Sequence, residues 1–379
     1  MSKLTNSRPA YILHEFDKSL FSASYFGFVP VEAPHVSEKD MEAVKDCGPE
    51  AYDKSAFLRS YVERGMANLP HPLTISYKKR DVGKRSFTHA LHILGLHSAL
   101  AEAILIRATL SILFERGFEH LVVEINSIGD KDSIVAYERE LHQCARKMAH
   151  ELTPEHKKKL KDDIFELLKL DLAENLHDHI PPSIASLSTQ SREHFKEMLE
   201  YLEALGVEFR LAHKLIGNRH FNSHTAFAIR DTDNENLLSE GFRYTRLTKR
   251  FGLKKEMPAV SATIFDLHKK ALSGNGEKMY KELPRPKFYL IQLGQKAKLK
   301  SLSLIELLRE NHIAIYHFLG KDKIVPQLMN AESLRVPYLL IIGQKEALEE
   351  TVTVRNVSTR AQETVKIADL PQFLKHIAL

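Results

Sequence analysis

The chain has 379 residues, of which 43% are apolar and 27% are charged, and its formal net charge is +5. This length allows two or three domains, and the composition excludes collagen-like, disordered and coiled-coil chains. No run of 18 apolar residues occurs, and the only cysteines, Cys47 and Cys144, stand far apart without a metal-ligand pattern. We therefore expect no membrane span, disulfide framework or metal site, and a cytoplasmic protein whose weak positive charge permits a nucleic-acid partner.

The first part of the chain predicts a sheet with flanking helices. Residues 98–116 carry apolar side chains around more than half of the helical turn, which predicts a well-buried helix. Three later segments are predicted to be successive strands of an antiparallel sheet, at 209–215, 225–230 and 239–244. The other predicted helices are 54–66, 133–170 and 188–205, and the other predicted strands are 28–31, 71–77, 86–95 and 121–125, with a turn at 126–130.

A second domain is predicted at the C-terminal end. Residues 271–286 hold Gly and Pro without periodicity, so we place a linker at 276–286, between a domain of residues 1–275 and one of residues 287–379. Strands and helices then alternate, which favours a small α/β domain with a largely parallel sheet. The predicted strands are 288–293, 313–318 and 336–343, the helices are 296–311, 321–335 and 371–377, and a hairpin joins 351–357 to 363–367.

Three stretches carry a resemblance to a known family. VVEINSIGDKDSIVAYEREL (122–141) and STQSREHFKEMLEYLEALGVEF (188–209) resemble the catalytic domain of histidyl-tRNA synthetase, a class II enzyme. VPYLLIIGQKEALEETVTVRNVSTRAQETVKI (336–367) resembles the anticodon-binding domain of the histidyl, prolyl, threonyl and glycyl enzymes. The resemblance implies an α+β fold, with a class II antiparallel-sheet core and flanking helices, followed by a small α/β anticodon-binding domain.

The first class II motif is also present in part. The segment FGFVPVEAP keeps Gly27 and Pro34. In class II enzymes this region builds the dimer interface, so the resemblance implies a homodimer.

Activation in this family joins a carboxylate to the α-phosphate of ATP, so cationic groups must hold the nucleotide and absorb the developing charge. In the second motif, read in ISYKKRDVGKRSFTHALHILGL, Arg85 and Phe87 match the returning strand. The family's glutamine position then falls on His89, and its substrate-binding glutamate position falls on Ile93. Arg85 is the one residual catalytic candidate.

The remaining motifs are altered as well. In LIGNRHFNSHTAF the key arginine position is Gly217, and Phe221 occupies part of the tyrosine pair. In PAVSATIFDLHKK a glycine position is Phe265 and the arginine position is His268. Pro49-Glu50 resembles the end of the family's Leu-Arg-Pro-Glu segment. Weak substrate-binding candidates are therefore Glu50, His89 and Phe221.

Losing one charge-stabilising donor typically costs about 10²–10³ in rate. Because four positions are altered together, we predict a catalytically inactive paralogue that needs no cofactor and binds tRNA or another structured RNA. The degenerate positions are Ile93, Gly217, Phe265 and His268, and the predicted RNA contacts are Lys321, Lys323, Gln327, Arg335 and Arg355.

Three alternatives stay open. An active, divergent histidine–tRNA ligase using ATP and Mg²⁺ would need replacement cations from Arg80, Arg85, Arg219 or Arg246. A regulatory subunit like the synthetase-related partner of ATP phosphoribosyltransferase is disfavoured by residues 287–379, because that family generally lacks the anticodon-binding domain. A scaffold would bind a protein partner through the old active-site cleft.

Overall fold

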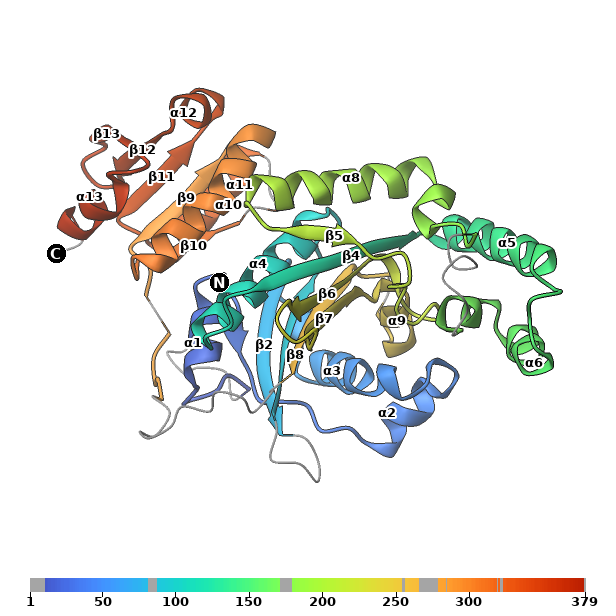
Figure 1. Ribbon diagram of the computed structural model, residues 1–379. Helices are drawn as coiled ribbons and strands as arrows, with labels where there is room; N and C mark the ends of the chain where they lie inside the picture. Colours follow the sequence, from blue (N-terminus) through green and yellow to red (C-terminus); the bar gives the residue numbers. More distant parts are fainter. Residues whose placement is uncertain are drawn as a thin grey trace.

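The computed structural model describes residues 11–80, 87–170, 179–253, 256–265, 279–283, 285–318, 320 and 323–377. Its larger sheet has eight strands in the order β1-β2-β3-β8-β7-β6-β4-β5 (Figure 1). The central pairs are antiparallel, whereas the edge strands β1 and β5 pair parallel to their neighbours. The strands are β1 (Val29–Pro30), β2 (Leu73–Arg80), β3 (Phe87–Leu94), β4 (Leu121–Gly129), β5 (Phe209–Leu211), β6 (Ser223–Asp231), β7 (Leu237–Arg243) and β8 (Ala259–Phe265).

Helices cover both faces of this sheet. The face that we call the α4 face contributes Leu91, Ile93 and Val260 to a core shared with α4, and the opposite α3 face contributes Tyr77 and Ala90 to a core shared with α3. Successive strand residues point to opposite faces, so neighbouring residues of one strand enter different cores. The helices are α1 (Lys18–Ser24), α2 (Glu38–Ala43), α3 (Tyr52–Glu63), α4 (Leu100–Glu115), α5 (Lys131–Lys147), α6 (Pro154–Asp162), α8 (Thr189–Ala204) and α9 (Thr245–Thr248).

The predicted buried helix at 98–116 is confirmed as α4, which is apolar and buried on nearly all sides. The prediction of one helix over 133–170 is wrong. The chain stops helix α5 at Lys147 and starts α6 at Pro154, where the Thr153 hydroxyl accepts a hydrogen bond from the His156 amide. A Thr-Pro pair is a helix-start signal, because the Pro needs no amide partner at the first position.

Two strand predictions also change. The predicted turn at 126–130 is the end of β4, which continues to Gly129 before Asp130 caps α5. The predicted strand at 209–215 is only Phe209–Leu211, and it pairs parallel to β4 at the sheet edge instead of preceding β6 in an antiparallel run. Edge placement depends on tertiary pairing, which the local pattern does not contain.

A separate five-stranded sheet begins at Phe288, in the order β10-β9-β11-β12-β13. Strands β10, β9 and β11 are parallel, and the predicted hairpin adds two antiparallel strands, so the sheet is mixed. The short helix α12 was not predicted. The elements are β9 (Phe288–Gln292), α10 (Gln295–Glu310), β10 (Ile315–His317), α11 (Ile324–Leu334), β11 (Tyr338–Ile342), α12 (Gln344–Glu349), β12 (Thr351–Asn356), β13 (Gln362–Lys366) and α13 (Leu370–Ile377).

This second sheet divides its side chains between two helical layers. Phe288 and Leu290 of β9 face the core that includes α10, whereas Tyr289 and Ile291 face the cluster that includes Ala331 of α11. Helix α10 lies beside the larger domain, and α11 lies on the other face of the sheet (Figure 1). No helix in the described ranges is long and apolar enough to cross a bilayer.

Candidate functional site

The centre of the α3 face is filled by the chain's own aromatic side chains. The ring centroids of His92 and Phe57 lie 3.8 Å apart in a stacked arrangement. The two ring nitrogens of His92 lie 2.8 Å from the Tyr244 hydroxyl and 3.3 Å from the Tyr77 hydroxyl. Burial, followed by the charge of Lys54, holds the pKa of His92 well below its usual range. A neutral imidazole offers one donor and one acceptor, and both positions are taken by the protein itself.

The residues of β3 divide between the two faces, which separates His89 and Ile93 from the cluster around His92. His89 and Ile93 have the same strand parity as Leu91, and Ile93 packs in the core shared with α4. Burial lowers the pKa of His89 to about 3, and the charge of Arg116 on the α4 side contributes. The β3 residues on the α3 side are Ala90, His92 and Leu94. His89 and Ile93 therefore cannot line a site on the α3 face, and strand alternation was the signal that would have separated them.

Gly217 is closed to a side chain. Its φ is +62°, and a Cβ added there would lie 2.2 Å from Asn222 Nδ2 and 2.5 Å from Phe242 Cε1. Contacts under about 3 Å require the neighbouring atoms to move, and this backbone conformation is costly for residues with a Cβ. The arginine expected at this position is thus missing, and the surrounding structure has also filled its space.

Two weak substrate-binding candidates lie near one another around Lys54. Glu50 accepts a hydrogen bond from the Asn218 side chain at 3.1 Å, and Phe221 is buried with its ring centroid 5.6 Å from the Lys54 ammonium. Lys54 and Glu240 are the charged groups that the sequence analysis missed. Burial lowers the pKa of Lys54 and raises the pKa of Glu240, and each side chain partly offsets the other's shift.

Only the first part of the third motif, up to Phe265, lies within the described residues. Phe265 ends β8 and pairs with Thr88 on the same face as Ala90 and Ser261. It is half-buried, so an aromatic ring occupies this end of the α3 face. His268 and Arg85 lie outside the described residues.

Of the arginines that could replace the lost catalytic cations, two bind other protein groups and one is exposed at the end of a strand. Arg219 pairs with Asp163 at 3.1 Å, and Arg246 donates to the carbonyl oxygen of Arg219 at 2.9 Å. Arg80 is exposed at the end of β2. A guanidinium that is already paired with a carboxylate contributes little positive field to a neighbouring pocket.

The most buried ion pair among the residues that the structure describes belongs to the α4 face. Arg243 donates two hydrogen bonds to Glu102, at 2.7 and 2.6 Å, and Glu102 also lies 3.2 Å from His194. Burial alone would raise the pKa of Glu102, but Arg243 and His194 outweigh it and hold that pKa well below its usual range. Since both partners are nearly inaccessible, this pair is a structural element of the domain.

Helix α11 and strand β12 carry the predicted RNA contacts that the structure describes. Lys323 and Arg335 are exposed at the two ends of α11, with Val325 and Met329 exposed between them at 61% and 65%. Arg355 is half-exposed on β12. Lys321 lies outside the described residues.

Gln327 is a correction to the predicted RNA surface. Its side chain is buried, accepts from the Gln292 amide at 3.0 Å and donates to the Gln292 carbonyl oxygen at 2.9 Å. This amide thus holds α11 on β9 and is unavailable to an RNA. A helical period places Gln327 on the side of α11 opposite its exposed residues.

An antiparallel sheet core followed by a separate mixed α/β domain defines the class II aminoacyl-tRNA synthetase fold with an anticodon-binding domain. Residues 287–377 match the family model of the anticodon binding domain. The apo histidyl-tRNA synthetase of S. aureus has a similar fold, with a TM-score of 0.52 and 21% identity over 93% of this chain and 92% of the other.

Sequence comparison agrees with this class. The histidine–tRNA ligase of Bacillus licheniformis is 25% identical over 334 residues, which cover 84% of this chain and 78% of the relative. That of Anoxybacillus flavithermus is 26% identical over 368 residues, covering 90% and 86%. The chain is therefore similar to histidine–tRNA ligases over most of its length.

Proposed function

We propose that this protein does not form histidyl-adenylate and acts as a tRNA-binding or regulatory protein. The supporting observation is the filled α3 face, where His92 is stacked on Phe57 and hydrogen-bonded by two tyrosines. The closed space at Gly217 adds to it, because no guanidinium fits there without moving Asn222 and Phe242. Adenylate formation needs preorganised cations around the reacting phosphate.

The proposal includes RNA binding through the C-terminal domain. Residues 287–377 match the anticodon binding domain, and Lys323, Arg335 and Arg355 supply its candidate cations. Contacts to phosphate would dominate the affinity, and unpaired bases would supply any specificity.

The proposal also includes the homodimer implied by Gly27 and Pro34. Analytical ultracentrifugation tests it, and a monomer at all concentrations would contradict it.

Pyrophosphate exchange with histidine, ATP and Mg²⁺ tests the loss of activation. We expect no histidine-dependent exchange above background, with the Bacillus licheniformis relative as the positive control. Robust exchange that depends on histidine would overturn the proposal and favour the active-ligase alternative. Isothermal titration with ATP and Mg²⁺ on the same preparation should show no binding.

Filter binding with bulk tRNA tests the second half of the proposal independently. We expect saturable binding by the full chain that weakens steeply as salt increases. Absence of saturable binding at low salt would exclude the RNA role while leaving the exchange result standing. The scaffold alternative would then be favoured.

A further inference from the structure

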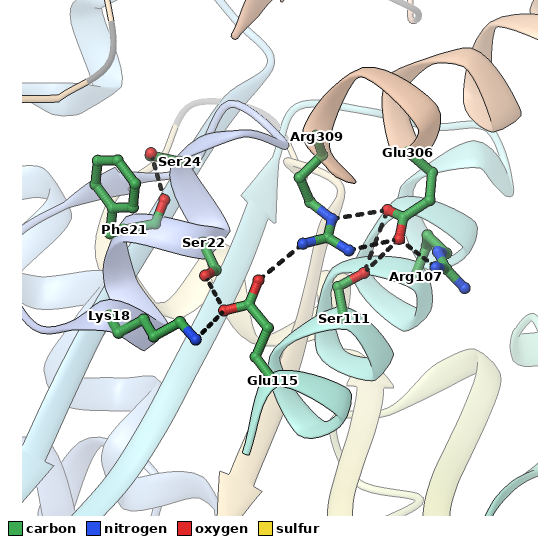
Figure 2. A network of polar contacts seen from close by, with 9 residues as sticks. All are labelled: Lys18, Phe21, Ser22, Ser24, Arg107, Ser111, Glu115, Glu306 and Arg309. Carbon is green, nitrogen blue, oxygen red and sulfur yellow. Dashed lines mark hydrogen bonds and ion pairs between the residues drawn. The ribbon is translucent and has the colours of Figure 1, made fainter. Parts of the chain in front are cut away.

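Helices α4 and α10 join the two domains through charged side chains (Figure 2). On α4, Arg107, Ser111 and Glu115 are spaced four residues apart, so they form one stripe on the helix surface. On α10, Glu306 and Arg309 are three residues apart and face that stripe. We call these five residues the α4–α10 network.

Glu306 is the centre of the α4–α10 network and is only 9% exposed. It forms an ion pair with Arg107, accepts from the Ser111 hydroxyl at 3.3 Å, and accepts from Arg309 at 3.0 and 2.8 Å. Burial alone would raise the pKa of Glu306, but the hydrogen bonds from Arg309 and Arg107 outweigh it and lower that pKa. The carboxylate is therefore charged at neutral pH and held by cations from both domains.

Arg309 extends the network from α10 back to the larger domain. Its remaining terminal nitrogen donates to Glu115 at 2.8 Å. Glu115 also accepts from the Ser22 hydroxyl of α1, and Lys18 lies 4.0 Å away. Figure 2 shows the chain of contacts running from α1 through α4 to α10. One arginine thus bridges two carboxylates that belong to different domains.

Apolar side chains of the two domains belong to one buried cluster, which includes Leu302 and Ile305 of α10 and Leu105 and Leu110 of α4. Nearby, the Ser303 hydroxyl donates to the carbonyl oxygen of Ala204, at the end of α8, at 3.2 Å. A charged network inside an apolar contact tolerates few alternative arrangements, because any displaced charge would be buried without its partner.

We propose that the α4–α10 network is a latch that fixes the orientation of the C-terminal domain on the core, so that both domains move as one body. The charges specify one docked arrangement, and the apolar contact around them provides the adhesion. Loss of one carboxylate leaves Arg107 and Arg309 buried without full compensation, which favours an undocked state. The latch does not depend on what either domain binds.

The test compares the docked fraction of full-length variants. Glu306→Gln keeps the shape of the side chain and removes its charge. We expect a larger radius of gyration by small-angle X-ray scattering and about tenfold faster trypsin cleavage between the domains, at Lys281 or Arg285, because cleavage follows the open population. Adding Arg107→Gln should restore part of the wild-type behaviour, since a neutral pair is less costly to bury than an unpaired arginine.

Glu350→Gln is the matched control, because Glu350 pairs with Lys300 inside the C-terminal domain. It makes the same chemical change and should leave scattering and cleavage at wild-type values. A folded Glu306→Gln protein that behaves like the wild type would refute the latch. If circular dichroism shows that this variant is unfolded, Arg309→Lys decides by the same two readouts, because it keeps the charge and loses the bridging geometry.

Discussion

The sheet of the larger domain and helix α11 of the C-terminal domain differ in how their polar side chains are paired. In the larger domain, His92 and Arg243 are buried and satisfied by partners from the same domain. In the C-terminal domain, Lys323 and Arg335 stand exposed at the ends of α11, and no carboxylate in the described part of the chain forms an ion pair with either. A site whose polar groups are already satisfied has little affinity left for a ligand, whereas unpaired surface cations remain available.

One of the two largest expected effects comes from removing an aromatic ring from the cluster on the α3 face. Phe57→Ala removes the ring on which His92 stacks, and we expect it to cost about 3–5 kcal/mol of unfolding free energy, from lost burial and the cavity left behind. Urea denaturation measures the change. Val62→Ala on the same helix is the control, because Val62 is 38% exposed and should cost under about 1 kcal/mol. Equal effects of the two substitutions would show that this face is loosely packed, and would weaken the contrast between the domains.

A second prediction concerns the Arg243–Glu102 pair and pH. The pKa of Glu102 is lowered in the folded chain relative to its ordinary value of 4.5, so its contribution to stability is present above about pH 4.5 and is lost as the pH falls further. Arg243→Met should cost about 3–5 kcal/mol at pH 7, because it leaves a buried carboxylate without its main partner.

The pH dependence separates this pair from the other carboxylates. Denaturant unfolding of Glu102→Gln between pH 5 and pH 3 should show a shallower loss of stability than the wild type, because the wild type must protonate the Glu102 carboxylate over this range. A parallel decline in the two proteins would mean that Glu102 does not titrate as the buried pair requires.

The third prediction tests the exposed cations of the C-terminal domain. The combined variant Lys323→Ala, Arg335→Ala and Arg355→Ala should weaken tRNA binding and reduce the slope of log K against log salt by about 0.7 for each lost contact to single-stranded phosphate. Lys375→Ala on α13 is the control: it removes one positive charge from the same domain, away from the three proposed contacts, and should leave the salt slope unchanged. An unchanged salt slope would place the RNA surface, if one exists, elsewhere on the molecule.

The smallest expected effect is at the surface of the larger domain. Arg250 holds the pKa of Asp46 at about 2 through hydrogen bonds. The Asp46 side chain is 56% exposed, so Asp46→Asn should cost less than about 1 kcal/mol in spite of that pKa. A thermal shift as large as that of Arg243→Met would contradict the distinction between buried and exposed pairs.

The sequence by itself was sufficient for features that local chemistry controls. Periodicity and turn residues were enough to predict three features. These are the apolar helix α4, the alternation of strands and helices after Phe288, and the hairpin of β12 and β13. The altered motif positions at Gly217 and Phe265 could also be identified from the sequence, because a lost arginine side chain and an added aromatic ring are properties of the residues themselves.

Only the tertiary structure decided which core each face packs against. Strand alternation puts His89 and Ile93 on the face opposite His92, but the packing of α3 and α4 decides what each face meets. Likewise, the helical period groups the residues of α11, but the packing of α11 on β9 decides that the side with Gln327 is buried. The ion pair between Arg309 and Glu115 joins residues 194 positions apart, and such a contact arises from the packing of whole helices.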